Sequence, residues 1–304
     1  MDRDLIVKNA ITSGGFQSTA NYAGYINPTL WNKTVLQFLE QVLVVADKAK
    51  VYTDLLNGEG ATLNVTVRTT PITAAAVAES ADVTISAYDG GQVVFTPTEY
   101  AAAFQLSDKQ ARRAFYDVQM DMAREIGYAL AELRDDTAIT LLQGGAGNSV
   151  VANNVVASDL ASSDTLDFDD IVKAMTEIRK DKLIPKWLVV SAGQAGDLLK
   201  LAQFVRADYA GDQLAFRGGL LGKVLGMDVY WTTQIAPATN VSTAIMGGVD
   251  NSGNAAFGIA LKANPTIRTQ RFELGRYTDI VGVEEWDLKI LRANGVCKIQ
   301  SYDA

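Results

Sequence analysis

The stretch SDKQARRAFYDVQMDMAREIGYALAELRDDTAITLLQGG, residues 107–145, carries the most regular pattern in this sequence. Ser107 with Gln110 three residues later is typical of the capping box that begins a helix. Apolar residues then recur at helical spacing, at Phe115, Val118, Met122, Ile126, Ala129 and Leu133. Gly144 can end the helix, since glycine readily adopts C-cap geometry. We predict one helix over residues 107–145, roughly 50 Å long at 1.5 Å per residue.

Two adjacent aspartates, Asp135 and Asp136, lie near the end of this pattern and suggest acid chemistry. Neighbouring helical residues diverge by about 100°, so we expect Asp135 to face away from the apolar stripe and Asp136 to lie at its edge. Carboxylates that diverge in this way cannot share a proton or a metal ion. Glu125, Glu132 and Asp136 follow one flank, where we expect basic partners within or between subunits. A metal or acid site on this flank is the alternative.

The composition favours a folded, acidic protein that lacks the usual catalytic side chains. Of its 304 residues 48% are hydrophobic, and its net charge of −8 disfavours sequence-specific binding of nucleic acid. The sequence has no histidine, which excludes Ser-His-Asp and Cys-His catalysis and the commonest zinc ligand. The single cysteine, Cys297, excludes an internal disulfide and a thiolate cluster. We therefore expect no catalytic, cofactor or metal site.

The N-terminal part predicts an arm followed by a helix. MDRDLIVKNA lacks the apolar run of a signal peptide, and no window approaches the roughly 18 apolar residues that span a bilayer, so we expect a cytoplasmic product. Residues 1–27, rich in Gly, Ser, Thr and Asn, predict an extended arm. Asn27 followed by Pro28 then predicts the start of a helix that ends near Lys48.

A period of two replaces the helical period over residues 58–100. Leu63, Val65 and Val67 alternate with polar residues, and QVVFTPTEY provides a second β-rich run. The middle, PITAAAVAESAD, is too small and polar to form its own core. We predict an extended, hairpin-like excursion that packs on something outside itself. A plain surface hairpin is the alternative.

The C-terminal half predicts a mixture of helix and strand. Residues 167–182 form a capped amphipathic pattern, and WLVVSAGQAGDLLKLA indicates a buried strand, a turn and a helix. In GGLLGKVLGMDVYW, Gly222 and Lys223 are followed by Val224 where a phosphate-binding loop needs Ser or Thr, so we interpret these glycines as turn residues. Asn294-Gly295, flanked by alternating apolar residues, predicts a β-hairpin.

The order of these elements resembles that of the major capsid proteins of tailed bacteriophages, whose fold is named after phage Hong Kong 97. ELRDDTAITLLQGGAG resembles the family's spine-helix ending, and GGLLGKVLGMDVYWTTQIAP resembles its axial-domain turn. The resemblance implies an α+β, Hong Kong 97-type major capsid fold. The implied parts are an N-terminal arm and helix (1–50), an extended β-hairpin loop (about 58–100) with flanking peripheral strands (51–106), a long spine helix of the peripheral domain (107–145), an axial domain (146–265) and return β-strands of the peripheral domain (266–304).

The resemblance also implies a structural role without catalysis. Subunits would assemble through hexamers and pentamers into the icosahedral shell of a virion, formed in the host cytoplasm around double-stranded DNA that is not read by sequence. Further implied partners are a separate scaffolding protein, a portal and, as an open alternative, a decoration protein, with no membrane. Loops around residues 208–217 would crowd the ring axis. The candidate intersubunit or charged-flank residues are Arg68, Glu79, Glu125, Glu132, Asp136, Asp208 and Arg217.

One departure from the type member of this family concerns covalent cross-linking. There a lysine on the extended loop joins an asparagine of a neighbouring subunit, whereas residues 51–100 here contain no lysine, the nearest being Lys50 and Lys109. We therefore predict a shell without such cross-links. An encapsulin compartment, which has the same fold, and a carboxylate-based enzyme are the alternative functions.

Overall fold

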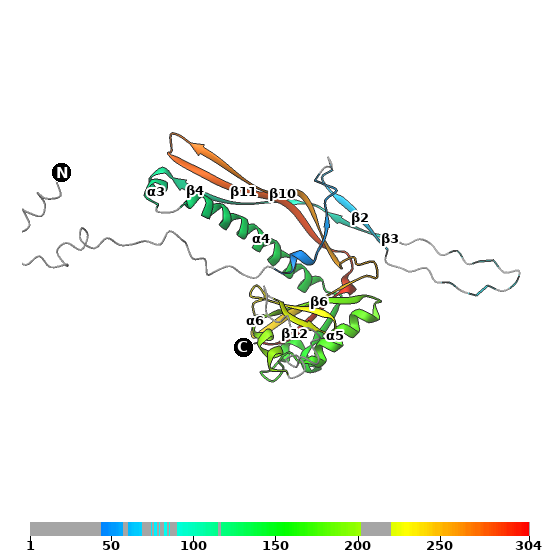
Figure 1. Ribbon diagram of the computed structural model, residues 1–304. Coiled ribbons are helices and arrows are strands. Elements are labelled where there is room, and N and C mark those ends of the chain that lie inside the picture. The colour runs from blue at the N-terminus through cyan, green and yellow to red at the C-terminus, as the bar shows by residue number, and fades with distance from the viewer. Residues whose placement is uncertain are drawn as a thin grey trace, which may run out of the picture.

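The computed structural model describes residues 44–56, 60–68, 74, 76–77, 79, 82–83, 85, 90–114, 117–201 and 220–303. Within these ranges the strands form a four-stranded, a six-stranded and a two-stranded sheet. Figure 1 shows an elongated arrangement, with the four-stranded sheet and the helix α4 above and the six-stranded sheet below. The expected arm lies outside the described residues, as do most of the helix predicted from Asn27-Pro28 and the candidate contacts Asp208 and Arg217. The described end of that predicted helix, residues 44–48, is not α-helical and holds only the 3₁₀ helix Ala46–Lys48.

The expected helix over residues 107–145 is in fact two helices, α3 (Asp108–Arg113) and α4 (Val118–Gly145). Ser107 Oγ accepts the N–H of Gln110 at 3.3 Å, which confirms the first cap. The backbone becomes extended at Ala114, and Asp117 then caps a new first turn by accepting the N–H groups of Gln119 and Met120. A second N-cap inside the pattern thus interrupts the single helix that we predicted. The 28 residues of α4 span about 42 Å.

The four-stranded sheet has the order β1 (Lys50–Tyr52), β10 (Phe257–Phe272), β11 (Tyr277–Ile290) and β4 (Thr98–Ser107). Helix α4 lies along one face of this sheet (Figure 1). Alternate residues of β11 are buried, among them Ile280 and Leu288. Gly282 is one of these buried residues, and its lack of a side chain lets α4 approach β11 closely. A Cβ at Gly282 would lie only 2.3 Å from Ile126 Cγ2 of α4. Helix α4 and the sheet therefore pack closely as two layers.

The six-stranded sheet has the order β5 (Asn148–Val151), β12 (Val296–Tyr302), β9 (Val241–Val249), β6 (Ile184–Ser191), β8 (Met227–Thr232) and β7 (Leu220–Val224). Helices α5 (Phe168–Lys180) and α6 (Ala192–Lys200) pack against it. Short 3₁₀ helices lie at Ala46–Lys48 (η1), Ala152–Asn154 (η2), Ala157–Asp159 (η3) and Ala293–Gly295 (η4). The apolar stripe of α5, with Ile171, Met175 and Ile178 buried, is as predicted.

Local signals in this half of the chain mostly agree with the structure. Asp167 caps α5 by accepting the N–H of Phe168 at 2.6 Å. Leu225 and Gly226 connect β7 to β8 with φ values of 52° and 85°, so the interpretation of Gly226 as a turn residue is confirmed. The same interpretation is wrong for Gly222, which lies within β7 next to a register shift, with a φ of 138°. Ser191 and Gln194 form a reciprocal capping box at the start of α6. Each of these signals acts over a few residues only.

A shared apolar core joins the two large sheets. It includes Trp187 of β6, Phe257 of β10, Trp286 of β11 and Leu142 of α4. The rings of Trp187 and Phe257 meet edge to face, with centroids 6.1 Å apart. Trp187 packs directly over Gly247, where a Cβ would lie 2.1 Å from the indole. The two sheets are therefore packed against each other through large aromatic side chains.

The two-stranded sheet confirms the expected excursion. β2 (Leu63–Arg68) pairs antiparallel with β3 (Gly90–Phe95), in a register that places Leu63 opposite Phe95. Phe95 is fully buried and packs with Leu55 and Ala260. The base of the excursion is thus attached to the body, and its strands lead away from it on the side opposite α3 (Figure 1).

The end of the chain differs from expectation. Asn294 and Gly295 belong to the 3₁₀ helix η4, and the strands on either side of it lie in different sheets, so the predicted hairpin is wrong. A Cβ at Gly295 would lie 2.6 Å from Ala256 Cβ, so close packing accounts for this glycine better than a hairpin turn does. The boundary predicted at residue 265 also does not follow the sheets, since β10 begins at Phe257 and β12 returns to the six-stranded sheet.

Candidate assembly surfaces

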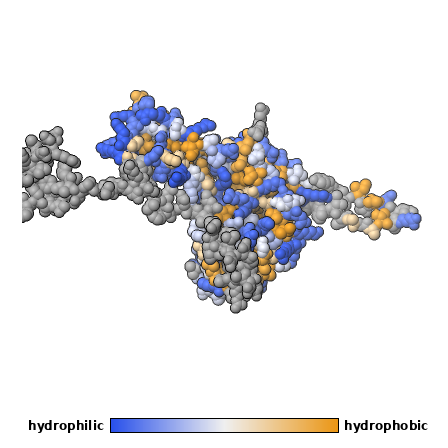
Figure 2. Space-filling model, viewed as in Figure 1, coloured by the Kyte–Doolittle hydropathy of each residue, from blue (hydrophilic) through white to orange (hydrophobic). Residues whose placement is uncertain are grey.

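Basic side chains gather at the end of the molecule formed by α3 and the β10–β11 turn. Figure 2 shows mostly hydrophilic side chains over this end. Arg271 binds both carboxylate oxygens of Asp108, at 2.8 and 2.9 Å, and this hydrogen bonding holds the pKa of Asp108 below its usual range. Leu274 is fully exposed at the turn. The neighbouring exposed cations of α3 and the turn are Lys109, Arg112, Arg113 and Arg276.

A buried ion pair fixes the spine helix to the sheet. Arg134 of α4 forms an ion pair with Glu284 of β11, whose side chain is only 1% exposed. The other oxygen of Glu284 accepts the indole N–H of Trp286 at 2.6 Å. Tyr100 of β4 stacks on Trp286, with the ring centroids 4.5 Å apart. This network connects three elements that form the upper part of the subunit.

Asp135 anchors the segment that follows the N-terminal region. Its carboxylate is fully buried and accepts the N–H groups of Val44, Val45 and Ala46 at 3.2, 2.7 and 2.6 Å. Burial raises the pKa of this carboxyl, even though the three hydrogen bonds favour the charged form. The position where residue 44 meets the body is therefore fixed by one side chain of the spine helix.

The prediction that Asp135 faces away from the apolar stripe is wrong. In the second half of α4 the buried positions are Asp135, Ala138, Ile139 and Leu142, which share one helical face. Ala129 and Leu133, which we assigned to the stripe, are exposed. The predicted apolar stripe followed Ala129 and Leu133 because we assumed that Asp135, as a charged residue, faces solvent. The partners of Asp135 are backbone N–H groups, which every residue except proline has, so the sequence does not reveal them.

The acidic flank of α4 is only partly as expected. Asp136 and Glu125 are exposed and Glu132 is half-buried, so the three side chains are accessible. Glu125 has an interaction partner within the chain. Among the described residues no ion pair involves Glu132 or Asp136, and only the backbone oxygen of Glu132 accepts a hydrogen bond, from Gln234 at 3.2 Å. Contacts of this flank with a neighbouring subunit stay a prediction.

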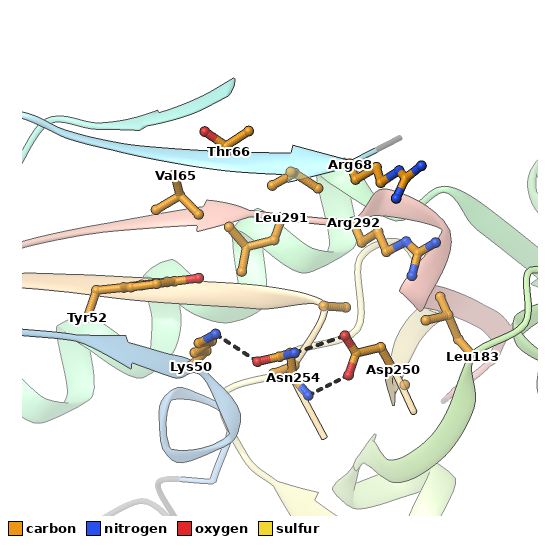
Figure 3. A pocket seen from close by; sticks show the side chains of 14 residues that line it. Lys50, Tyr52, Val65, Thr66, Arg68, Leu183, Asp250, Asn254, Leu291 and Arg292 are labelled. Carbon is orange, nitrogen blue, oxygen red and sulfur yellow. Dashed lines mark hydrogen bonds between the residues drawn. The ribbon is translucent and has the colours of Figure 1, made fainter. Parts of the chain in front are cut away.

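The two candidate residues of the excursion, Arg68 and Glu79, are both exposed. Figure 3 shows Arg68 beside Arg292 at one end of a cavity of about 440 Å³ beneath β2. Lys50 Nζ donates to Asn254 Oδ1 at 2.7 Å, and Asn254 donates to Asp250 at 2.9 Å. Lys50, Arg68 and Arg292 thus line this cavity together with Asp250, and Arg292 was not found by sequence reasoning.

A second buried network ties the end of the chain to the six-stranded sheet. Asp303 Oδ2 accepts the hydroxyl groups of Ser191 and Ser242, both at 2.5 Å. Gln194 donates to Ser301 Oγ at 2.8 Å. These residues are all buried, and the network serves packing and orientation. From the sequence we placed Ser191 in a turn and missed its capping role.

The described residues contain neither a metal-binding cluster nor a membrane-spanning helix. No group of three or more His, Cys, Asp or Glu side chains in the described ranges could hold a metal ion. No helix in the part of the chain that the structure describes is long and apolar enough to cross a membrane. Cys297 is buried, and burial raises the pKa of its thiol to about 12.

Comparison with known families agrees with this architecture. A family model described as phage capsid protein matches residues 90–304. The chain belongs to the phage capsid protein family. A sequence search against curated proteins finds no significant match.

Solved structures similar to this member of the phage capsid protein family extend the match to nearly the whole chain. A chain of Mycobacterium phage Che8 has a TM-score of 0.66 at 18% identity, covering 90% of this chain and 97% of that one. The capsid of cyanophage P-SCSP1u has a TM-score of 0.69 at 13% identity, covering 92% and 94%. The capsid of the native GTA particle has a TM-score of 0.66 at 14% identity, covering 95% and 100%. The α+β, Hong Kong 97-type fold is thereby confirmed.

Proposed function

We propose that this chain is the major capsid subunit of a tailed phage, which assembles through hexamers and pentamers into an icosahedral shell around double-stranded DNA. The observation that carries the proposal is the likeness of nearly the whole chain to capsid subunits. In a single copy the extended loop projects from the body and the spine helix has an exposed face, so both are available for contacts with neighbouring copies. Ring contacts of this kind are heterologous, with one surface meeting a different surface of the next copy.

The proposed partners follow from this role. The loops around residues 208–217 would lie near the ring axis, and Glu132 and Asp136 would face cations of a neighbour. A separate scaffolding protein, a portal and a decoration protein would act with the shell in the virion, which forms in the host cytoplasm. The net charge of −8 supports DNA packaging without tight or sequence-specific binding. The subunit itself would catalyse no reaction.

Electron microscopy tests the proposal directly. We expect the chain, expressed together with its neighbouring genes, to form closed shells of uniform size that sediment far faster than the 32.7 kDa subunit. The physical reason is that large heterologous interfaces close into rings and shells only when copies are present at sufficient concentration. Compact monomers that persist at all protein concentrations and salt conditions would contradict it. Packaged enzymes in place of DNA would favour the encapsulin alternative.

Covalent cross-linking gives a second prediction. Residues 51–100 contain no lysine, so the extended loop has no amine that could form an isopeptide bond. We expect purified shells, boiled in detergent and reductant, to run as a single band near 32.7 kDa on a denaturing gel. A ladder of heavier bands that survives boiling would contradict this prediction. Shells of a lysine-bearing relative, treated in parallel, provide the positive control.

A further inference from the structure

The cavity beneath β2 collects positive charge in a chain that is acidic as a whole. Its volume of about 440 Å³ lies within the range of small-molecule sites. The charged side chains that line it are Lys50, Arg68, Arg292 and Asp250. Three cations against one carboxylate leave an excess of two positive charges, although the whole chain has a net charge of −8. A local excess of this kind attracts anions.

The one carboxylate of the cavity is already satisfied by its own turn. Asp250 Oδ1 accepts the backbone N–H groups of Ser252 and Asn254 at 2.8 Å each, and Oδ2 accepts the side-chain N–H of Asn254 at 2.9 Å. Burial opposes its ionisation, but these hydrogen bonds and the charge of Arg292 hold the pKa of Asp250 below its usual range. Within the described ranges Asp250 belongs to no ion pair, so it does not occupy the three cations.

Two arginines from distant parts of the chain meet at one end of the cavity. Arg68 is the last residue of β2, and Arg292 lies between β11 and η4. Figure 3 shows the two side chains one above the other, with both guanidinium groups at the same end. Both also line an adjoining hollow of about 330 Å³, where Asp181 accepts N–H groups of Asn148 and Asn294 at 3.2 Å each. Neighbouring guanidinium groups repel each other, and an anion between them removes this repulsion.

Lys50 provides the third cation and is more buried than the arginines. Its Nζ donates to Asn254 Oδ1 at 2.7 Å and lies 5.3 Å from the centroid of the Tyr52 ring. An ammonium group has three N–H bonds, so further donors remain for a ligand. Arg68 has an interaction within the chain, but a guanidinium group with five N–H donors can bind a ligand as well.

We propose that this cavity binds a phosphate group, held by the guanidinium groups of Arg68 and Arg292 and by the ammonium group of Lys50. A phosphate group has enough oxygen atoms to accept from two guanidinium forks at once, whereas a carboxylate is matched by one. The ligand is a free phosphate or pyrophosphate ion, or a phosphate of nucleic acid, since these share the recognised chemistry.

The phosphate group connects the base of the excursion to the body. Arg68 belongs to β2, Lys50 to β1 of the four-stranded sheet, and Arg292 follows β11 where the chain passes toward the six-stranded sheet. Removing the repulsion between Arg68 and Arg292 therefore favours the position of β2 against the body. The inference concerns the single subunit and does not depend on the proposed capsid function.

Calorimetric titration of the unassembled full-length chain with sodium pyrophosphate tests the site. We expect saturable binding of about one pyrophosphate per chain and a higher melting temperature than in sodium chloride of the same ionic strength. Arg68→Gln/Arg292→Gln should weaken the affinity about tenfold or more, since it removes two charge-assisted contacts. Arg68→Lys/Arg292→Lys, which keeps the charge but loses the fork geometry, should have an intermediate affinity. Lys109→Gln/Arg113→Gln, an equal loss of charge at α3, should bind like the parent.

Three results would overturn the site. These are the absence of saturable binding in the parent, an unchanged affinity in Arg68→Gln/Arg292→Gln, and an equal loss of affinity in Lys109→Gln/Arg113→Gln, which would indicate general attraction to positive charge. All four side chains are exposed, so the substitutions leave the apolar core intact. Circular dichroism and thermal melting without ligand check that each variant is folded.

Two further measurements identify the source of the phosphate and test the connection that it makes. A short single-stranded DNA that displaces pyrophosphate assigns the site to nucleic acid, and one that does not assigns it to free phosphate ions. Hydrogen exchange of the amides of residues 63–68 and 90–95 should slow when pyrophosphate is bound, because β2 is then held against the body. Binding without this protection would contradict the connecting role.

Discussion

Replacing Glu284 with Ala is expected to lower the free energy of unfolding by about 3–5 kcal/mol, the range for breaking one partner out of a buried ion pair. The Glu284 side chain is 1% exposed, and its loss leaves the Arg134 guanidinium against the sheet without its counter-charge. The indole N–H of Trp286 loses its acceptor as well. Urea unfolding followed by tryptophan fluorescence measures the change, with the subunit kept unassembled at low concentration.

Glu285 supplies a matched control on the same strand. It lies one residue further along β11, on the opposite face, and its register partner is Glu99 of β4. Like charges directly opposite each other in a sheet are mildly unfavourable, so Glu285→Ala should be neutral or slightly stabilising. The double variant Arg134→Leu/Glu284→Leu should lose less than Glu284→Ala, because no charge is left buried and unpaired. A Glu284→Ala protein as stable as the Glu285→Ala protein would contradict the assigned role.

Replacing Asp135 with Ala is expected to destabilise the protein by several kcal/mol, since it leaves the N–H groups of Val44, Val45 and Ala46 without their acceptor. A buried donor without a partner costs about 1–3 kcal/mol. The segment at residues 44–46 should also be cleaved faster by a protease, because among the described residues of α4 only Asp135 accepts hydrogen bonds from its amides. Urea unfolding and timed proteolysis measure the two effects. Asp136→Ala, at an exposed neighbour, should stay within about 0.5 kcal/mol of the parent.

The pH dependence of this variant follows from the raised pKa of Asp135. A carboxyl whose pKa is raised on folding stabilises the folded state most below its ordinary pKa, and this contribution is lost as the pH rises through the raised value. The stability advantage of the parent over Asp135→Ala should therefore be largest in acid and should narrow toward neutral pH. Unfolding curves of both proteins between about pH 4 and about pH 8 test this, with about 3.9 as the ordinary value. An advantage that widens with rising pH would contradict the assignment.

Local patterns predicted much of the fold because their causes are local. The caps at Ser107 and Asp167, the alternation of β2 and the turn at Gly226 each depend on hydrogen bonds or backbone geometry within a few residues. The break between α3 and α4 was missed, because a helical apolar pattern continues across it. Asp117 was the available signal, since an aspartate at that position can start a new helix.

The candidate site could be predicted only in part, because its key contacts join distant segments. Asp135 accepts amides 89 to 91 residues away, and Arg134 pairs with a residue 150 positions away. Backbone donors carry no side-chain signature, so the burial of Asp135 could not be found from residue types. The hairpin predicted at Asn294-Gly295 failed for a related reason: the two flanking strands have better partners elsewhere, β11 with β4 and β12 with β9.

That misread turn has a mechanical consequence. Within the described residues the chain passes between the four-stranded layer and the six-stranded layer at three places: from α4 to β5, from β9 to β10, and from β11 to β12. Two layers joined by a single chain segment can rotate about it. Three connecting segments, together with the aromatic core around Trp187, resist both bending and twisting. A load applied to the upper layer is thus shared among three covalent paths. We therefore expect the four-stranded and six-stranded layers to move together as one stiff unit when a force acts on either of them.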